Sequence, residues 1–172
     1  SAPYGVFALL AALIVDIAGD DPADTISLFK ALGVYGITVI IGLLMMIFVV
    51  YPIFLKIFTR VKFSRFARKV SPVQLLAFST SSSAATLPLT METAEEKLGI
   101  NNETSSFVLP LGATINMDGT SLYQAVAAVF LAQVYGMDLG LSEQLTIILT
   151  ATLASIGSAA VPGAGMVMLI IV

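Results

Sequence analysis

Asp118 is the residue whose type and position most clearly imply chemistry. It is the only charged residue in the apolar stretch 104–137. A carboxylate in a membrane segment costs several kcal/mol unless it is paired, so such residues usually face a cavity, an ion or a proton path. Asp118 is therefore the first candidate for a functional site.

Oxygen donors, and no basic residues, accompany this carboxylate. The apolar segments contain neither Lys nor Arg, so a bound cation is the natural partner for Asp118. Thr114, Asn116, Thr120 and the backbone near two glycines supply the hard oxygen ligands that alkali and alkaline-earth ions prefer. A protonated Asp118 that is hydrogen-bonded to a neighbouring helix is the alternative.

Two further apolar segments are interrupted at their centres. Seven of the ten residues 79–88 are Ser, Thr or Pro, and Pro and Gly occupy the centre of 144–172. Pro and Gly inside an apolar helix free backbone groups that lipid cannot satisfy. Each segment is therefore interpreted as two half-helices that meet at a tip inside protein, a re-entrant hairpin. Two kinked spanning helices, packed through small residues, are the alternative.

The two tips also resemble each other. Residues 81–88 and 155–162 both run from Ser through six small or apolar residues to Pro. Paired interrupted segments in two halves of a chain are a sequence pointer to a transporter binding site at the membrane midplane. The similarity of the two tips favours a transporter with two re-entrant hairpins. It does not exclude the alternative of two kinked spanning helices.

The composition indicates the elements that hold these residues. The chain is 58% hydrophobic and 11% charged, whereas soluble domains have about 45–50% apolar and about 25% charged residues. Residues 31–55 carry no charge, and a helix of that length exceeds the roughly 30 Å hydrocarbon core. We expect an all-α integral membrane protein with transmembrane helices and two re-entrant helical hairpins.

The charges indicate the topology. Six of the eight basic residues lie between positions 56 and 69, whereas acidic residues dominate the connection before residue 30. By the positive-inside rule the basic connection is cytoplasmic and the acidic one lies on the opposite side. A lipid-headgroup site is the less favoured explanation of the basic cluster.

Several chemistries are excluded. Without Cys or His, these residues form no disulfide, thiolate nucleophile, Ser-His-Asp triad or Cys/His metal site. The net charge of −3 disfavours nucleic acid as a partner. Asp16 and Asp118 are poorly placed for an aspartyl protease, because Asp16 ends its helix and Asp118 lies mid-segment. We expect no enzyme, and an ion channel lined by Asp118 is a remote alternative.

Three motifs, in order, resemble the glutamate/neutral amino-acid transporter family, the dicarboxylate/amino acid:cation symporters that include the archaeal aspartate transporters. They are SSSAATLP at 81–88, NMDGT at 116–120 and VPGAG at 161–165. The resemblance implies a multi-pass protein of the cell membrane and a homotrimer in the lipid bilayer. It also implies sodium-coupled symport of an amino acid by an elevator mechanism, with no cofactor besides the coupling ions.

The resemblance also implies a domain organisation, in which the chain is an internal fragment. Residues 1–29 would be part of the fifth helix of the scaffold with an extracellular loop, and 30–172 part of the transport domain. The expected elements of that domain are the sixth helix 30–58, a basic cytoplasmic loop 56–69, hairpin one 70–99, the seventh helix 104–137 with an unwound centre, and a truncated hairpin two 141–172.

Site residues follow from the same resemblance. The expected substrate-binding residues are Ser81, Ser82, Ser83, Thr120, Val161, Pro162, Gly163, Ala164 and Gly165. The expected sodium ligands are Gly112, Thr114, Asn116, Met117, Asp118, Ser155, Ile156 and Ser158, several of them through backbone carbonyls. Free N–H groups at half-helix N-termini suit a substrate carboxylate.

Two departures from the family pattern bear on branch and coupling. Ala84 and Gly163 stand where many animal members have Ser and Gln, which suggests a prokaryotic-type sequence. Proton-coupled bacterial members tend to carry a carboxylate at the first tip and Leu in place of Met117, so sodium coupling is favoured over a proton-coupled dicarboxylate or glutamate symporter. The selectivity helix would follow Val172, so aspartate, glutamate and small neutral amino acids all remain open as substrates.

Overall fold

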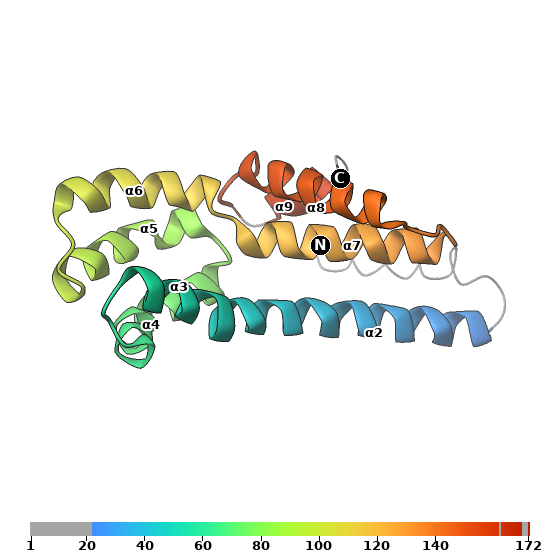
Figure 1. The fold of residues 1–172 in the computed structure, drawn as a ribbon, viewed down its shortest axis with the longest axis horizontal. Coiled ribbons are helices and arrows are strands. Elements are labelled where there is room, and N and C mark those ends of the chain that lie inside the picture. The colour runs from blue at the N-terminus through green and yellow to red at the C-terminus, as the bar shows by residue number, and fades with distance from the viewer. Residues whose placement is uncertain (1–21, 162, 170–171) are drawn as a thin grey trace, which may run out of the picture. The chain divides into compact units, whose positions relative to one another are not determined.

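The computed structural model describes residues 22–161, 163–169 and 172. All regular secondary structure in these residues is helical (Figure 1), which confirms the all-helical prediction for the described part of the chain. The predicted fifth helix, with Asp16, lies outside the described residues. In chain order the elements are α2 Pro22–Met45, η1 Met46–Val50, α3 Tyr51–Phe58, α4 Phe63–Thr80, α5 Ser83–Glu92, η2 Thr93–Lys97, α6 Asn102–Ile115, α7 Asp118–Val134, α8 Leu141–Ile156 and α9 Ala164–Met168.

Tertiary contacts divide the chain into two units, residues 1–40 and 41–172. The motifs singled out in the sequence all fall in the second unit, so the site can be described within that unit alone.

Residues 22–58 are continuously helical through α2, the π-helical turn η1 and α3. The 33 residues 26–58 form the one helix, among those described, that is long and apolar enough to cross a membrane. The helix begins earlier than the predicted position 30 because the acidic residues near its start do not oppose helix formation. Pro52 lies in the first turn of α3, directly after the π-helical turn.

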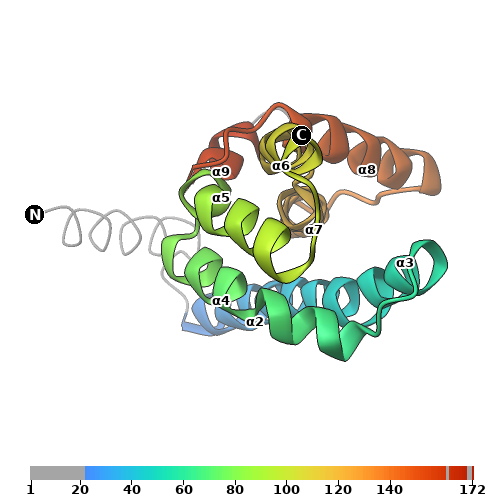
Figure 2. The same ribbon diagram turned by 90° about the vertical axis from the view of Figure 1, so that its left-hand side faces the viewer.

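The predicted first hairpin folds as two packed helices. α4 and α5 pack against one another (Figure 2). Lys69 in α4 donates a hydrogen bond to the carbonyl of Lys97 at the end of η2, so the two arms run antiparallel. The chain reverses at Ser81 and Ser82, and Pro88 lies inside α5.

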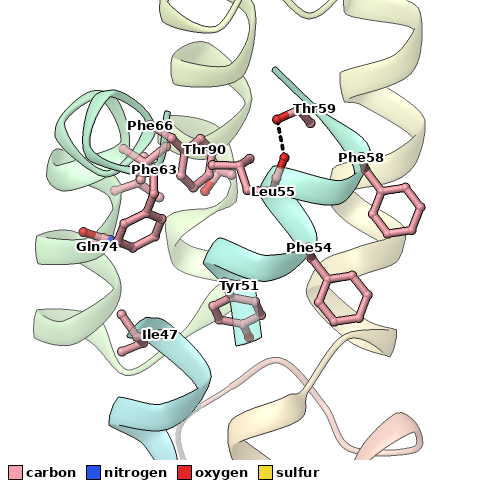
Figure 3. Close-up of a pocket in the computed structure, with 12 residues that line it drawn as sticks. Ile47, Tyr51, Phe54, Leu55, Phe58, Thr59, Phe63, Phe66, Gln74 and Thr90 are labelled. Carbon is pink, nitrogen blue, oxygen red and sulfur yellow. Dashed lines mark hydrogen bonds between the residues drawn. The ribbon is translucent and has the colours of Figure 1, made fainter. Parts of the chain in front are cut away.

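The basic connection is shorter than predicted. Only residues 59–62 of the range 56–69 lie outside helices, because α3 continues to Phe58 and α4 starts at Phe63. Phe63, Phe66 and Val70 recur at helical spacing and line an apolar pocket between α3 and α4 (Figure 3). This apolar face explains the early start of α4, since the positive-inside rule indicates the side of the membrane and not the backbone conformation.

The second half of the unit is built around α7. A two-residue break separates it from α6, and α8 packs along it (Figure 1). α9 contacts both α7 and α8. The tip of the predicted second hairpin is thereby held beside the start of α7.

Small residues form the interior of this packing. Among the described residues the buried apolar side chains are Ala94, Ala127, Ala132, Ala151 and Ala154, whereas large apolar side chains such as Phe78, 88% exposed, point outward. Small residues at helix contacts and large apolar residues on the outside are the arrangement that a lipid environment favours.

Candidate functional site

The first tip is a strained turn closed by a serine. Ser81 ends α4 in the left-handed region at φ 49°, a conformation that L-residues other than Gly, Asn and Asp seldom adopt. Ser82 is buried, and its Oγ accepts a hydrogen bond from the N–H of Ala85 at 3.2 Å. Ser82 is thus the N-cap of α5.

The two tips are hydrogen-bonded to each other. The Ser82 hydroxyl donates to the carbonyl of Ala160 at 2.9 Å, and the N–H of Ala84 donates to the same carbonyl at 3.2 Å. These bonds join residues 78 and 76 positions apart in the sequence. They bring together the Ser-rich and the Pro/Gly-rich tips that the sequence analysis paired.

The break between α6 and α7 releases backbone oxygens. Asn116 has φ −89° and ψ 83°, and Met117 has φ −117° and ψ 54°. The N–H of Met117 bonds to Ile115 instead of Ala113, and that of Thr120 bonds to Met117 instead of Asn116. The carbonyls of Ala113 and Asn116 are therefore relieved of their helical hydrogen bonds, while that of Gly112 still accepts from Asn116 at 2.9 Å. Asn and Asp favour such breaks because their side chains compete with helical backbone bonding.

Asp118 opens α7 with two polar partners. The Asn116 amide, with its nitrogen turned toward the carboxylate, donates to Oδ1 at 2.6 Å and to Oδ2 at 3.2 Å. The Tyr51 hydroxyl donates to Oδ2 at 2.8 Å. The described residues contain no cluster of three or more acidic, Cys or His side chains, so a cation here would depend on one carboxylate with neutral oxygens. Such a donor set suits a weakly bound, singly charged ion.

α9 approaches the start of α7 closely. A Cβ at Gly165 would lie 2.8 Å from Thr120 Cγ2 and would also meet the Tyr123 hydroxyl. Gln124, which is fully buried, donates from Nε2 to the carbonyl of Gly165 at 2.8 Å. The predicted substrate residues Thr120 and Gly165 are therefore in contact.

The end of α8 contributes buried hydroxyls. Ser155 and Ser158 are buried, and the Ser155 hydroxyl donates to the carbonyl of Thr152 at 2.8 Å. Among the described residues, Ser158 Oγ has no hydrogen-bond partner although it is buried. An orphaned buried oxygen of this kind is what an absent polar ligand would satisfy.

Most of the remaining predicted site residues are exposed in the structure. Ser81, Ser83, Thr114, Ile156, Val161 and Gly163 are exposed, and Pro162 lies outside the described residues. Gly163 has φ 81°, which only glycine adopts readily and which directs the chain into α9. Ala164 follows as the first residue of α9.

Sequence reasoning missed two residues of this cluster, Tyr51 and Gln124. Gln124 had a detectable signal, because it is a polar residue in the apolar stretch 104–137. Tyr51 had a weaker one, its position before a proline in a charge-free segment. Neither signal identifies the partner, which lies 41 positions away for Gln124 and 67 for Tyr51.

Comparison with known proteins identifies several relatives. Excitatory amino acid transporter 3 of Homo sapiens is 45% identical over 170 residues, which is 99% of this chain and 31% of the relative. A Caenorhabditis elegans protein named as a sodium-dependent excitatory amino acid transporter is 48% identical over 170 residues, 99% of this chain and 33% of the relative. Excitatory amino acid transporter 1 of Mus musculus is 43% identical over 171 residues, which is 99% of this chain and 31% of the relative.

The chain spans about a third of the length of these relatives. All three are animal proteins, so they lend no support to the expectation of a prokaryotic-type sequence. The sodium:dicarboxylate symporter family matches residues 1–172. Because this match covers the whole chain, the chain belongs to the sodium:dicarboxylate symporter family.

Proposed function

We propose that this chain is the substrate- and ion-binding part of a sodium-coupled amino-acid symporter. The observation that carries the proposal is the direct hydrogen bonding between the two tips, through Ser82, Ala84 and the carbonyl of Ala160. Two separately interrupted helix pairs that converge on one point are what a midplane binding site requires. Thr120 lies against Gly165 beside this point, which adds a hydroxyl to the converging backbone groups.

The substrate binds, in this proposal, between the tips and the start of α7. Ser81 to Ser83 and residues 161–165 surround it, and Thr120 offers its hydroxyl. The N-terminal turn of α5 adds partial positive charge beside a substrate carboxylate, while its Ala84 and Ala85 N–H groups are already bonded to Ala160 and Ser82. The names of the relatives, with "excitatory amino acid" in each, favour an acidic amino acid over a small neutral one.

Sodium binds in the proposal around the break before α7 and at the end of α8. Asn116 and Asp118 hold one ion, and backbone carbonyls near Gly112 and Asn116 hold a second. A third uses the carbonyls of Thr114, Ser155, Ile156 and Ser158 with Met117 nearby. The released carbonyl of Asn116 supports the second placement, and the buried, unpartnered hydroxyl of Ser158 is a further oxygen donor at the end of α8.

The same proposal includes the membrane architecture. A membrane location follows from the family, and the helix 26–58 has the length and composition to span a bilayer. We propose a multi-pass cell-membrane protein in which α4 with α5, and α8 with α9, are re-entrant hairpins. Residues 30–172 belong to a transport domain that moves, elevator-like, against a scaffold that includes residues 1–29, in a homotrimer.

Reconstituted uptake tests the function. The full-length protein in liposomes is assayed with aspartate, glutamate, serine and alanine, with an inward sodium gradient, with an equal proton gradient, and with neither. We expect saturable, sodium-dependent uptake of aspartate and glutamate. Uptake that is unchanged without a sodium gradient would contradict sodium coupling, and uptake driven by protons alone would favour the proton-coupled alternative.

A further inference from the structure

Tyr51 contacts the site from a helix that contributes none of the expected ligands. Its hydroxyl donates to Asp118 Oδ2 at 2.8 Å. The bond links α3 to the first residue of α7, 67 positions away. Tyr51 therefore forms a hydrogen bond with one of the two oxygens of Asp118, the carboxylate on which the proposed ion site depends.

A π-helical turn sets the direction of Tyr51. Its N–H bonds to the carbonyl of Met46, five residues earlier, which closes the turn η1 at Tyr51 itself. Pro52 follows and has no N–H to continue the α-helical pattern from Phe48. One extra residue per turn rotates the following side chains by about 100° around the helix axis. The turn thus aims Tyr51 at Asp118, and single π turns recur at functional sites in proteins.

The Asp118 carboxylate is held from both sides. With its amide nitrogen turned toward the carboxylate, Asn116 donates to Oδ1 at 2.6 Å, and Tyr51 donates to Oδ2. Carboxylates that ligate metal ions are generally oriented by such hydrogen bonds, and loss of one typically weakens metal binding by about 10–100-fold. We propose that Tyr51 is a positioning residue for sodium, whose hydroxyl holds the Asp118 carboxylate in the orientation that receives the ion. This inference rests on the proposed function, in which Asp118 is a sodium ligand.

A purely structural bond between α3 and α7 makes a different prediction. The Tyr51 ring lines the apolar pocket together with Phe54 and Phe66 (Figure 3), so Tyr51→Phe keeps the ring and removes only the hydroxyl. If the bond served stability alone, this variant would lower the melting temperature and leave the sodium dependence unchanged. If the bond positions the carboxylate, the sodium dependence changes while substrate affinity at saturating sodium does not.

The experiment measures sodium dependence of amino-acid uptake by the full-length protein in liposomes. The variants are Tyr51→Phe, Asp118→Asn and, as the matched control, Tyr135→Phe, which removes the hydroxyl of a tyrosine that is 78% exposed. For Tyr51→Phe we expect about a tenfold rise in the sodium concentration for half-maximal uptake. The substrate KM at saturating sodium is expected to stay within about twofold, a change too small to reflect a lost substrate contact. Tyr135→Phe is expected to match the unmodified protein in both measurements.

Three outcomes would overturn this inference, and only the second would also remove Asp118 from the proposed ion site. If Asp118→Asn changes sodium dependence and Tyr51→Phe does not, the positioning role is overturned and the ion site stands. If neither variant changes it, Asp118 is not a sodium ligand and the proposal for Tyr51 fails with it. A rise in the sodium requirement of Tyr51→Phe that is matched by Tyr135→Phe would likewise overturn the positioning role.

Discussion

Ser82 at the first tip donates its hydroxyl to the backbone carbonyl of Ala160 at the second, at 2.9 Å. The Ser82 hydroxyl oxygen also accepts a hydrogen bond from the N–H of Ala85. One buried hydroxyl therefore both caps α5 and connects the two tips. The arrangement makes the geometry of each tip depend on the other. Binding of a substrate between the tips would therefore depend on the hydrogen bonds of Ser82.

Replacement of this hydroxyl is expected to weaken substrate binding. Ser82→Ala removes the N-cap bond, which is typically worth about 1 kcal/mol, and the bond to Ala160, worth about 0.5–1.5 kcal/mol. We expect a fall in substrate affinity of about tenfold, measured by substrate binding to the purified full-length protein. Ser79→Ala is the control, since the Ser79 hydroxyl bonds to the carbonyl of Leu75 in its own helix. Equal affinities of the two variants would contradict a role for the tip bond.

Gly165 is expected to tolerate no side chain. The added methyl group of Gly165→Ala would approach Thr120 Cγ2 to 2.8 Å and would also meet Tyr123. Because overpacking at a helix contact costs about 1–3 kcal/mol, we expect α9 to be displaced and saturable uptake to fall by at least about tenfold.

The matched substitution for this test is Gly36→Ala. A Cβ at Gly36 meets nothing within 4 Å, and Ala is favoured over Gly inside a helix by about 1 kcal/mol. Gly36→Ala should therefore retain uptake. Normal uptake by Gly165→Ala would show that the close approach of α9 to α7 is not needed for transport.

The end of the first hairpin is expected to depend on one buried serine. Ser105 is 1% exposed, and its hydroxyl donates to the Glu95 carboxylate, which also accepts from Asn102 at 3.0 Å. Hydrogen bonds to charged groups contribute about 1.5–3 kcal/mol, so Ser105→Ala should lower the melting temperature of the full-length protein. Ser106→Ala, which removes a neighbouring exposed hydroxyl bonded within its own helix, should not. Equal melting temperatures of Ser105→Ala and Ser106→Ala would contradict a stabilising role for the bond between Ser105 and Glu95.

Local signals in the sequence predicted part of this fold. The charge-free run 31–55 indicated a long helix, and the Ser-rich and Pro/Gly-rich centres indicated where helices end, because such residues disfavour continued helix in an apolar segment. The turn at Ser81 and Ser82 falls within the first of these centres.

The contacts between distant segments could not be predicted in this way. That Tyr51 faces Asp118 depends on a π-helical turn and on how α3 packs, and neither follows from residue spacing. The early start of α4 depends on a pocket formed with α3. The bond from Gln124 to Gly165 depends on the return of α9 against α7. Each of these relations exists only once the helices are packed.

Asp118→Asn tests the ion site most directly. The substitution preserves size, replaces one acceptor oxygen by a donor nitrogen, and removes the only charge in the stretch 104–137. Because ion affinity at oxygen sites depends on the charge of the ligands, we expect the sodium concentration for half-maximal uptake to rise by at least about tenfold, or about 1.4 kcal/mol. The measurement is uptake by the full-length protein in liposomes at graded sodium and constant ionic strength.

The control for this variant is Asp138→Asn, which changes an exposed carboxylate between α7 and α8. It has the same effect on net charge, so any contribution of overall charge to sodium attraction appears in both variants. A site at Asp118 requires that only Asp118→Asn shifts the sodium curve. Identical curves for the two variants would remove Asp118 from the ion site, and the oxygens at the end of α8 would then be the place to look for the coupling ion.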